Sequence, residues 1–247
     1  MSCPIIIVPA RLASRRLPAK ALADIAGQPM IVRVWARAMA AGVGPVVVAT
    51  DCAEIAATVT VAGGRAVMTD PAHASGSDRI AEAVAAIDPD GAHDLVVNVQ
   101  GDEPLVEPEA IRAAVALMDD PLVDIATLGV PAAQAERDDP DAVKVAAAGI
   151  GRGRLRALYF SRAAVPWGEG ATIRHIGLYA YRRAALARFV ALPPSPLEQR
   201  ERLEQLRALE AGMRIDLALV DKAARGVDTP ADLARVRAVF AGQGKER

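Results

Sequence analysis

The first half of the chain alternates short apolar runs with segments whose apolar residues have helical spacing. The runs are rich in β-branched side chains, which favours strands. The predicted strands cover residues 5–8, 46–50 and 95–99, and the helices after them cover residues 30–41, 53–61 and 107–118. The runs are apolar throughout, as is typical of strands covered by helices on both faces. The pattern therefore predicts an α/β fold with a Rossmann-like, doubly wound and mostly parallel sheet, whose ligands bind at the carboxyl ends of the strands.

The pattern is looser from about residue 121 onward. Apolar runs predict strands at residues 123–130, 143–148 and 176–181, separated by turns rich in glycine and arginine near residues 149–154 and 168–172. A proline-rich breaker precedes a helix predicted at residues 197–211, and a strand near residues 214–220 leads to a C-terminal helix. We interpret this half as a mixed-sheet extension. Because no repeat or linker divides the chain, we expect a single domain of residues 1–247.

Composition narrows the classes of partner. A chain of 247 residues that is about half apolar can bury a substantial core, and a net charge of −1 with 3% aromatic residues argues against a nucleic-acid partner. Cys3 and Cys52 are too few for a disulfide framework, and His73, His93 and His175 have no metal-ligand spacing. No apolar window reaches the roughly 18 residues of a membrane span. We therefore expect a cytoplasmic protein without a membrane partner.

A basic loop follows the first predicted strand, which ends at residue 8. The segment Pro9–Lys20 has no acidic residue and carries four cations, Arg11, Arg15, Arg16 and Lys20. Cations at the carboxyl end of a strand suit a polyphosphate. The loop lacks the glycine pattern of a dinucleotide fingerprint, and the chain has no GxxxxGK(S/T) motif, so side chains would have to bind the anion. A merely solvated basic loop is the alternative interpretation.

An acidic turn follows the strand at residues 95–99. In the segment Asn98–Pro104, Gly101 permits a tight turn, and Asp102 and Glu103 stand at the edge of the sheet that also carries the basic loop. Carboxylate oxygens are the ligands that Mg2+ prefers. Acidic turns are more often structural than metal-binding. It is the shared edge that makes this turn a candidate metal site.

A second acidic turn, Gly226–Pro230, precedes the C-terminal helix. Thr229 and Asp232 have the spacing of a capping box around a proline at the first helical position. Asp228 is then not needed as a cap. It is therefore available as a second metal carboxylate.

Three further polar features have two interpretations each, and one of them is His175, for which a structural role competes with a functional one. Ser75 and Asp78 have capping-box spacing before a helical pattern, and the loop Ser75–Arg79 is also placed to recognise a base. In the predicted helix at residues 197–211, Gln205 falls within the apolar arc and Glu204 lies at its border. Buried polar groups need partners, which a neighbouring backbone group or a bound polyol supplies.

In this order the segments resemble the 3-deoxy-manno-octulosonate cytidylyltransferase (CMP-Kdo synthetase) family nearly end to end. The resemblance is carried by Val8–Arg11 with Arg16–Lys20, His73–Arg79, Asn98–Pro104, Tyr159–Arg162 with Pro166–Trp167, Arg174–Tyr179, Ser195–Glu198 with Leu203–Leu206, and Gly226–Pro230. Several such motifs in one order are specific. The chain departs from the family pattern at Ala19, where glycine is frequent, and in a shorter stretch between Trp167 and Arg174.

The resemblance implies a GT-A-like nucleotidyltransferase that uses CTP and 3-deoxy-manno-octulosonate (Kdo), forms a homodimer, and makes CMP-Kdo and pyrophosphate for lipopolysaccharide biosynthesis. Residues 1–120 would mainly bind the nucleotide, residues 121–215 the sugar and the partner subunit, and residues 216–247 would return to the core. The implied catalytic residues, of which the two aspartates hold Mg2+, are Arg11, Lys20, Asp102 and Asp228. The implied nucleotide-binding residues are Pro9, Ala10, Arg11, Arg16, Lys20, Ser75, Gly76, Asp78, Arg79, Gln100 and Gly101. The implied sugar-binding residues are Gln100, Arg162, His175, Tyr179, Glu204 and Gln205.

Other functions remain open at this point. A cytidylyltransferase for another acid sugar, such as 8-amino-Kdo or sialic acid, would share the nucleotide half and differ around His175, Glu204 and Gln205. A nonenzymatic nucleotide-sensing module would need the phosphate loop but not the paired carboxylates. An NAD-dependent dehydrogenase is disfavoured because no GxGxxG motif follows a strand.

Overall fold

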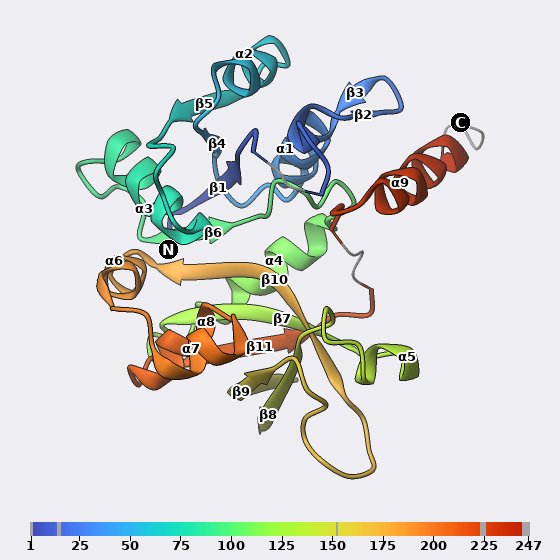
Figure 1. Cartoon of the computed structure of the whole chain (residues 1–247). Coiled ribbons are helices and arrows are strands. Elements are labelled where there is room, and N and C mark those ends of the chain that lie inside the picture. The colour runs from blue at the N-terminus through green and yellow to red at the C-terminus, as the bar shows by residue number, and fades with distance from the viewer. Residues whose placement is uncertain (1, 14–15, 152, 223–225, 244–247) are drawn as a thin grey trace. The chain divides into compact units, whose positions relative to one another are not determined.

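The computed structural model describes residues 2–13, 16–151, 153–222 and 226–243. The described residues form two compact units, the first within residues 3–111 and 226–243, the second within residues 112–222 (Figure 1). The sequence boundary between them falls inside α4 (Pro108–Leu117). The predicted division of functions at residues 120 and 215 stays a prediction.

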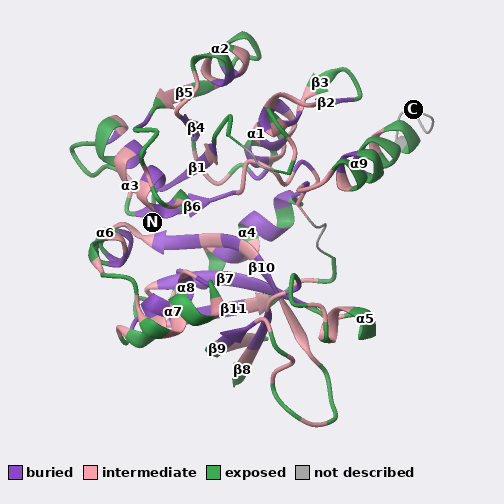
Figure 2. Cartoon of the chain, in the orientation of Figure 1, coloured by how far each residue is buried: buried purple, intermediate pink, exposed green. Residues whose placement is uncertain are grey.

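The first unit contains a parallel sheet with helices between its strands. In spatial order its strands are β5 (Arg65–Met68), β4 (Val46–Thr50), β1 (Pro4–Ala10) and β6 (Leu95–Asn98). The connecting helices are α1 (Met30–Ala40), α2 (Ala53–Val61) and α3 (Gly76–Ile87). The three inner strands are almost wholly buried (Figure 2). These elements confirm the predicted α/β fold and its parallel, doubly wound sheet.

The strand order reverses direction at β1. The chain passes from β1 to β4 and β5 on one side, and then crosses through α3 to β6, which pairs with β1 on the other side. Right-handed crossovers in opposite directions place α3 on the face opposite α1 and α2. Ligands of doubly wound sheets bind at such a reversal, beyond the carboxyl ends of the strands. Strand β1 extends two residues further at its C-terminal end than predicted, because Pro9 and Ala10 pair with Ala49 and Thr50, and it begins one residue earlier, at Pro4.

The C-terminal helix α9 (Pro230–Gln243) packs against the N-terminal part of the first unit. Val227, Leu233 and Val236 form a buried cluster with Ile25 and Met30, next to the hairpin of β2 (Asp24–Ile25) and β3 (Gln28–Pro29). Figure 1 shows α9 in red beside this hairpin. The cluster fixes the residues just before α9, including Asp228, to the core that also carries the basic loop.

The second unit has a mixed sheet. Its strands are, in order, β10 (Ile173–Arg182), β7 (Ile125–Pro131), β11 (Ile215–Leu219), β9 (Arg154–Ser161) and β8 (Lys144–Gly151). β7 and β11 are parallel and the other pairs are antiparallel, and β8 also pairs with the start of β10, so the sheet curls back on itself. The mixed-sheet prediction is confirmed. Strand β9 and helix α6 (Arg183–Ala191) were not predicted.

The prediction of one helix over residues 197–211 is wrong. The segment forms two short helices, α7 (Pro196–Glu201) and α8 (Gln205–Glu210). Arg202 has a left-handed backbone (φ 56°) that ends α7, and the guanidinium of Arg162 donates to its carbonyl oxygen at 3.4 Å. Because the single helix does not form, the predicted placement of Gln205 within its apolar arc and of Glu204 at the border of that arc is also wrong. Gln205 is nevertheless buried, at 8% exposure.

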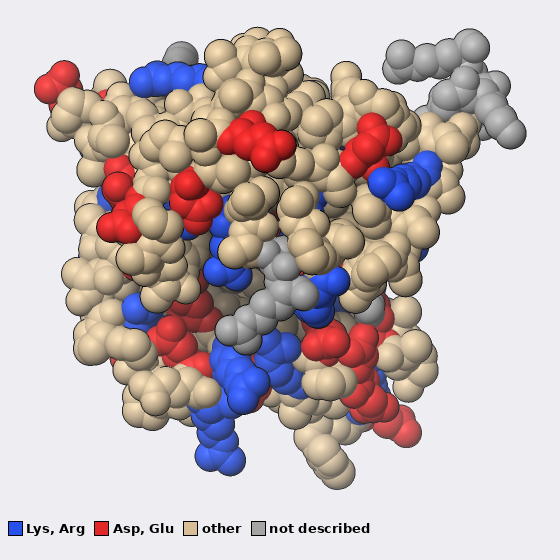
Figure 3. Space-filling view, turned by 45° about the horizontal axis from the view of Figure 1, so that its top comes forward, with Lys and Arg blue, Asp and Glu red and all other residues tan. Residues whose placement is uncertain are grey.

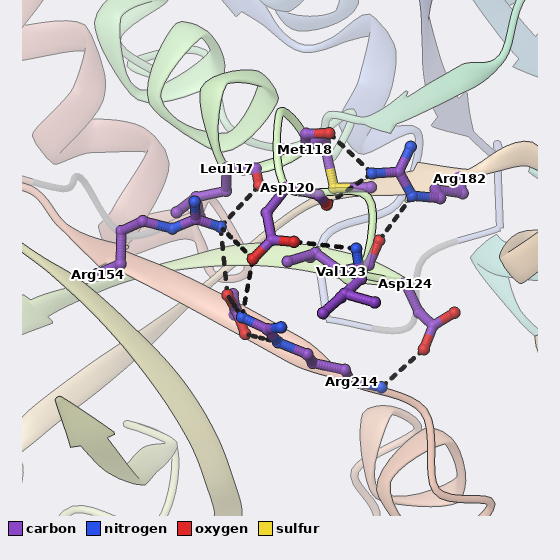
Figure 4. A network of polar contacts seen from close by, with 10 residues as sticks. Leu117, Met118, Asp120, Val123, Asp124, Arg154, Arg182 and Arg214 are labelled. Atoms are coloured by element: carbon purple, nitrogen blue, oxygen red, sulfur yellow. Dashed lines mark hydrogen bonds and ion pairs between the residues drawn. The ribbon is translucent and has the colours of Figure 1, made fainter. Parts of the chain in front are cut away.

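Within the second unit, a charge network ties the turn after α4 to strands β9, β10 and β11 (Figure 4). The fully buried carboxylate of Asp216 accepts hydrogen bonds from Arg214 at 2.8 and 2.9 Å and from Arg154 at 3.3 Å. Arg214 also pairs with Asp120 at 3.1 Å, and Arg182 donates to the carbonyl oxygens of residues 118, 120 and 123. The surface in Figure 3 carries acidic and basic side chains near one another, in keeping with a net charge of −1.

Candidate active site

A cleft of about 850 Å³ lies in the first unit, where β1 and β6 end. It brings together every residue that was predicted to bind the nucleotide, except Asp78. Those lining residues are Pro9, Ala10, Arg11, Arg16, Lys20, Ser75, Gly76, Arg79, Gln100 and Gly101. The predicted metal carboxylates Asp102 and Asp228 also line it. The cleft thus lies at the reversal of the strand order.

Close backbone packing fixes the turn after β6 against β1 and against the segment before α9. A Cβ atom on Gly101 would lie 2.5 Å from the carbonyl oxygen of Pro9, so only glycine fits there without a shift of the backbone. The amide of Val227 donates to the carbonyl oxygen of Asp102 at 2.8 Å. These contacts hold Asp102 and Asp228 on one wall of the cleft, although they are far apart in sequence.

Lys20 joins the two carboxylates. Its ammonium lies 2.6 Å from Asp102 Oδ2 and 3.1 Å from Asp228 Oδ1, and Arg16 pairs with Asp228 Oδ2 at 3.0 Å. Lys20 begins a short 3-10 helix, Lys20–Leu22, and its side chain is 15% exposed. The Arg16 pair is far more exposed and is worth little by itself. The sequence predicted that these groups share an edge, and the structure shows that they touch.

Arg11 differs from the other cations of the loop. It is exposed, lines the cleft, and makes no ion pair within the described ranges 2–13, 16–151, 153–222 and 226–243. Its charge is therefore available to an anion. Arg15, counted among the loop's cations above, lies outside the described residues.

Helix α3 presents its N-terminus to the cleft. The predicted capping box is confirmed, since the hydroxyl of Ser75 accepts from the amide of Asp78 at 3.1 Å and the Asp78 carboxylate accepts from Ser75. Arg79 is buried and donates to Thr69 Oγ1 at 2.5 Å and to Asp51 Oδ2 at 2.8 Å. The capping box uses the carboxylate of Asp78, while Ser75 and Gly76 line the cleft beside the positive end of the helix dipole.

His73 lines the cleft but was given no role from the sequence. Its Nε2 lies 2.5 Å from Glu82 Oε2. Hydrogen bonds from the amide of Asp70 and from His73 lower the pKa of Glu82. The only signal in the sequence was its place at the start of the His73–Arg79 segment.

Five of the predicted sugar-binding residues lie in the second unit, and Gln100 lies in the first. His175 and Tyr179 are on β10, with ring centroids 5.4 Å apart. Burial, and then the positive charge of Arg174, lower the pKa of His175 to about 3, so the ring is neutral at physiological pH. Its Nε2 lies 2.9 Å from the hydroxyl of Thr127, a residue to which the sequence pattern assigned no role in the site.

Arg162 and Glu204, two other predicted sugar residues, are held by protein groups. The guanidinium of Arg162 donates to the carbonyl oxygens of Pro140 and Glu201, each at 2.9 Å, and its amide donates to the Glu201 carboxylate. Burial would raise the pKa of Glu201, but hydrogen bonds from Arg162 and its neighbours lower it overall. Glu204 Oε1 accepts from Arg207 at 3.0 Å. The hydrogen bonds from Arg162 to the carbonyl oxygens of Glu201 and Arg202 stabilise the turn after α7.

The carboxylates fit a divalent metal ion. Asp102 and Asp228 already converge on one cation, the ammonium of Lys20. No cluster of three or more Asp, Glu, His or Cys side chains occurs in the part of the chain that the structure describes. Mg2+ typically takes one or two protein carboxylates and completes its shell with water and substrate phosphates, so a pair is sufficient.

A parallel α/β unit with cations and paired carboxylates at its switch point defines a nucleotide-binding enzyme of the nucleotidyltransferase class. The sequence model of the family described as cytidylyltransferase matches residues 5–215. The chain therefore belongs to the cytidylyltransferase family, which sets aside both the nucleotide-sensing module and the dehydrogenase.

Similar proteins match this chain over nearly its whole length. The chain is 62% identical to a 3-deoxy-manno-octulosonate cytidylyltransferase of Methylobacterium radiotolerans, covering 98% of this chain and 99% of the relative. It is also 62% identical to that of Azorhizobium caulinodans, covering 96% and 95%.

Solved structures agree with these relatives. A CMP:2-keto-3-deoxy-manno-octonic acid synthetase complexed with CTP superposes with a TM-score of 0.91 at 41% identity, covering 98% of this chain and all of that one. A nucleotidyl transferase from Methanothermobacter, at 17% identity and a TM-score of 0.64, shares the fold. No helix in the described parts of the chain is long and apolar enough to cross a membrane.

Proposed function

We propose that this enzyme transfers CMP from CTP to the anomeric hydroxyl of Kdo, giving CMP-Kdo and pyrophosphate for lipopolysaccharide biosynthesis. The observation that carries the proposal is the cleft of the first unit, where two carboxylates and three cations of the basic loop, Arg11, Arg16 and Lys20, line the switch point of the sheet. The 41% identical synthetase complexed with CTP supports cytidine triphosphate as the nucleotide. The 62% identical relatives support Kdo as the acceptor.

The reaction is an in-line displacement at the α-phosphorus of CTP. The anomeric oxygen of the sugar forms the new P–O bond as its hydroxyl proton passes to solvent. The bond between the α-phosphorus and the oxygen that bridges to the β-phosphorus breaks, and pyrophosphate leaves with that oxygen and the negative charge. Such transfers depend mainly on alignment and on charge stabilisation. Arg11, whose charge is unpaired among the described residues, and Lys20 would stabilise the charge that passes to pyrophosphate.

Asp102 and Asp228 would hold Mg2+. Bound there, the ion would neutralise phosphate charge and lower the pKa of the attacking hydroxyl. Lys20, which also lines the cleft, would then contact phosphate oxygens as well as the two carboxylates. Ser75, Gly76 and Arg79, at the start of α3, would recognise the cytosine. His175, Tyr179, Glu204, Gln205, Gln100 and Arg162 are the residues proposed for the sugar.

A pyrophosphate-release assay tests the proposal. The four ribonucleoside triphosphates are crossed with Kdo, 8-amino-Kdo and sialic acid, with and without Mg2+. We expect release with CTP, Kdo and Mg2+ together. Release with sialic acid or 8-amino-Kdo but not with Kdo would keep the class of enzyme and change its sugar.

Variants of the carboxylates test the metal assignment. Asp102→Asn and Asp228→Asn should each abolish turnover in a folded protein, because each removes a charged ligand with little change in volume. Asp90→Asn, at an exposed position of the same unit, is the matched control and should keep full activity. Full activity of either cleft variant would reject the two-carboxylate site.

The homodimer and the cytoplasmic location remain predictions. Leu122, Leu158 and Trp167 of the second unit are 71%, 59% and 97% exposed, and exposed apolar side chains of this kind support contact with a second copy. Light scattering of the purified protein measures the oligomeric state directly.

A further inference from the structure

An irregularity in β10 lies in sequence between His175 and Tyr179, the two ring residues of the proposed sugar site. In the ladder with β7, Ile176 lies opposite Leu128, but the next pair is Tyr179 opposite Thr127, so residues 177 and 178 are extra. The side chain of Thr127 is fully buried at this bulge. Its hydroxyl oxygen lies 2.9 Å from the carbonyl oxygen of Leu178 and 3.1 Å from that of Ile176.

The bulge changes the distance between His175 and Tyr179. Residues four apart on a regular strand are separated by about 13 Å along it. Here the ring centroids are only 5.4 Å apart, and Phe160 packs its ring against His175 at 4.9 Å. The bulge therefore brings both rings to one place, and the Thr127 hydroxyl lies within hydrogen-bond distance of the carbonyl oxygens of Ile176 and Leu178 at the bulge.

The same hydroxyl constrains the proton of His175. A hydroxyl has one proton to donate, and donating it to a carbonyl of the bulge leaves its lone pairs to accept from His175 Nε2, at 2.9 Å. Burial keeps the imidazole neutral by lowering its pKa to about 3, so the ring carries a single proton. If that proton is on Nε2, Nδ1 is an acceptor. The opposite arrangement would turn the hydroxyl proton toward the ring and away from both buried carbonyl oxygens, which is costly.

We propose that Thr127 is a positioning residue: it holds the bulge of β10 and fixes neutral His175 with its proton on Nε2, so that Nδ1 accepts a hydrogen bond from a hydroxyl of the sugar. His175 then does not act as a cation for the sugar's carboxylate. The inference rests on the proposed function in so far as His175 contacts the sugar, whereas the position of the proton is independent of the substrate.

The first experiment reads the proton directly. The chain has three histidines, so a 15N-histidine-labelled sample gives few ring signals, and a His175→Gln sample identifies those of His175. At neutral pH we expect a protonated Nε2 and an unprotonated Nδ1. A proton on Nδ1 in the wild type would overturn the proposal, whatever sugar the enzyme uses.

The second experiment uses steady-state kinetics of three variants. Thr127→Val keeps the shape and removes the hydroxyl, Thr127→Ser keeps the hydroxyl, and Thr60→Val is a control on an exposed face of α2. We expect Thr127→Val to raise KM for Kdo about tenfold or more with KM for CTP unchanged, and Thr127→Ser and Thr60→Val to stay within about threefold of the wild type.

The outcomes separate the two proposals. If wild-type enzyme turns over and Thr127→Val has the wild-type KM for Kdo, the positioning role is rejected. If the wild type does not use Kdo, the proposed function fails, and the 15N signals still decide the proton position. If Thr127→Val does not fold, as far-UV circular dichroism would show, then the wild-type 15N spectrum and Thr127→Ser carry the test.

Discussion

The burial of His175 predicts a specific loss of stability in mild acid. The folded protein lowers the pKa of this ring to about 3 from an ordinary value of 6.5, because burial disfavours the charged form and Arg174 adds repulsion. Between these two values the unfolded chain binds a proton that the folded chain does not. The stability that the ring contributes is therefore complete above about pH 6.5 and is lost as the pH falls from there toward 3.

The magnitude can be worked out at pH 5. There the ordinary pKa of 6.5 exceeds the pH by about 1.5, and each pKa unit corresponds to about 1.4 kcal/mol, so protonation of the unfolded chain costs about 2 kcal/mol of folding stability. This figure hardly depends on the folded value, provided that the pKa in the folded state stays well below 5. It is a large share of the stability of a typical domain.

The assay compares urea unfolding at about pH 7.5 and pH 5 for the wild type and His175→Gln. All three tyrosines (Tyr159, Tyr179 and Tyr181) lie in the second unit, so near-ultraviolet circular dichroism of tyrosine follows the unit that contains His175. We expect the wild type to lose about 2 kcal/mol more than the variant between the two pH values. His93→Gln, in the first unit, is the control and should behave as the wild type. Equal losses in the wild type and His175→Gln would refute the assigned neutral state.

Two further substitutions probe the framework of each unit. Gly101→Ala places a Cβ atom 2.5 Å from the Pro9 carbonyl oxygen, so we expect the variant to lose about 1–3 kcal/mol of stability and to bind CTP more weakly. Thermal unfolding measures the stability and calorimetry measures the binding. Unchanged CTP binding would contradict the close packing at this glycine. Asp216→Asn removes a fully buried charge from between Arg154 and Arg214. Because the two arginine side chains are about a fifth exposed, we expect urea unfolding to show a loss of about 2–3 kcal/mol of stability, with CTP binding retained. A loss below about 0.5 kcal/mol would show that the charge network does not stabilise the fold.

The strands that the sequence predicted best are those buried on both faces. Val46–Thr50 was predicted and found with the same bounds, because burial on both faces requires an unbroken apolar run. Strand β5 was missed because it lies at the sheet edge with little burial, so its residues need not be apolar. Strand β9 was missed because exposed and half-buried residues interrupt its apolar positions next to a glycine-rich turn.

The candidate site was predictable as a place but not as a set of contacts. Parallel strands bring their carboxyl ends to one edge, so a basic loop and acidic turns after strands must lie near one another. The ion pairs of Lys20 join residues 82 and 208 positions apart, which no local pattern encodes. Thr127 looks like any β-branched strand residue, and its value comes from a bulge in a partner strand about 48 positions away.

The ion pairs of Lys20 and Arg16 lead to a last prediction about metal removal. These two cations cancel the charges of Asp102 and Asp228, so without a divalent ion Arg11 supplies most of the uncompensated positive charge among the described lining residues. The affinity for CTP should therefore fall in EDTA.

Because Lys20 and Arg16 neutralise Asp228, the variant Asp228→Asn should have opposite effects on CTP binding and on turnover. Asp228→Asn should bind CTP about fivefold more tightly than the wild type in EDTA, because removing a half-exposed negative charge near a triphosphate is worth about 1 kcal/mol. In Mg2+ the same variant should lose turnover, since it also loses a metal ligand. Calorimetry at low and high salt measures the first effect, which salt should weaken, and Asp90→Asn is again the control. Weaker binding by Asp228→Asn in EDTA would mean that its carboxylate does not oppose the triphosphate, and that Lys20 needs this partner in order to bind phosphate at all.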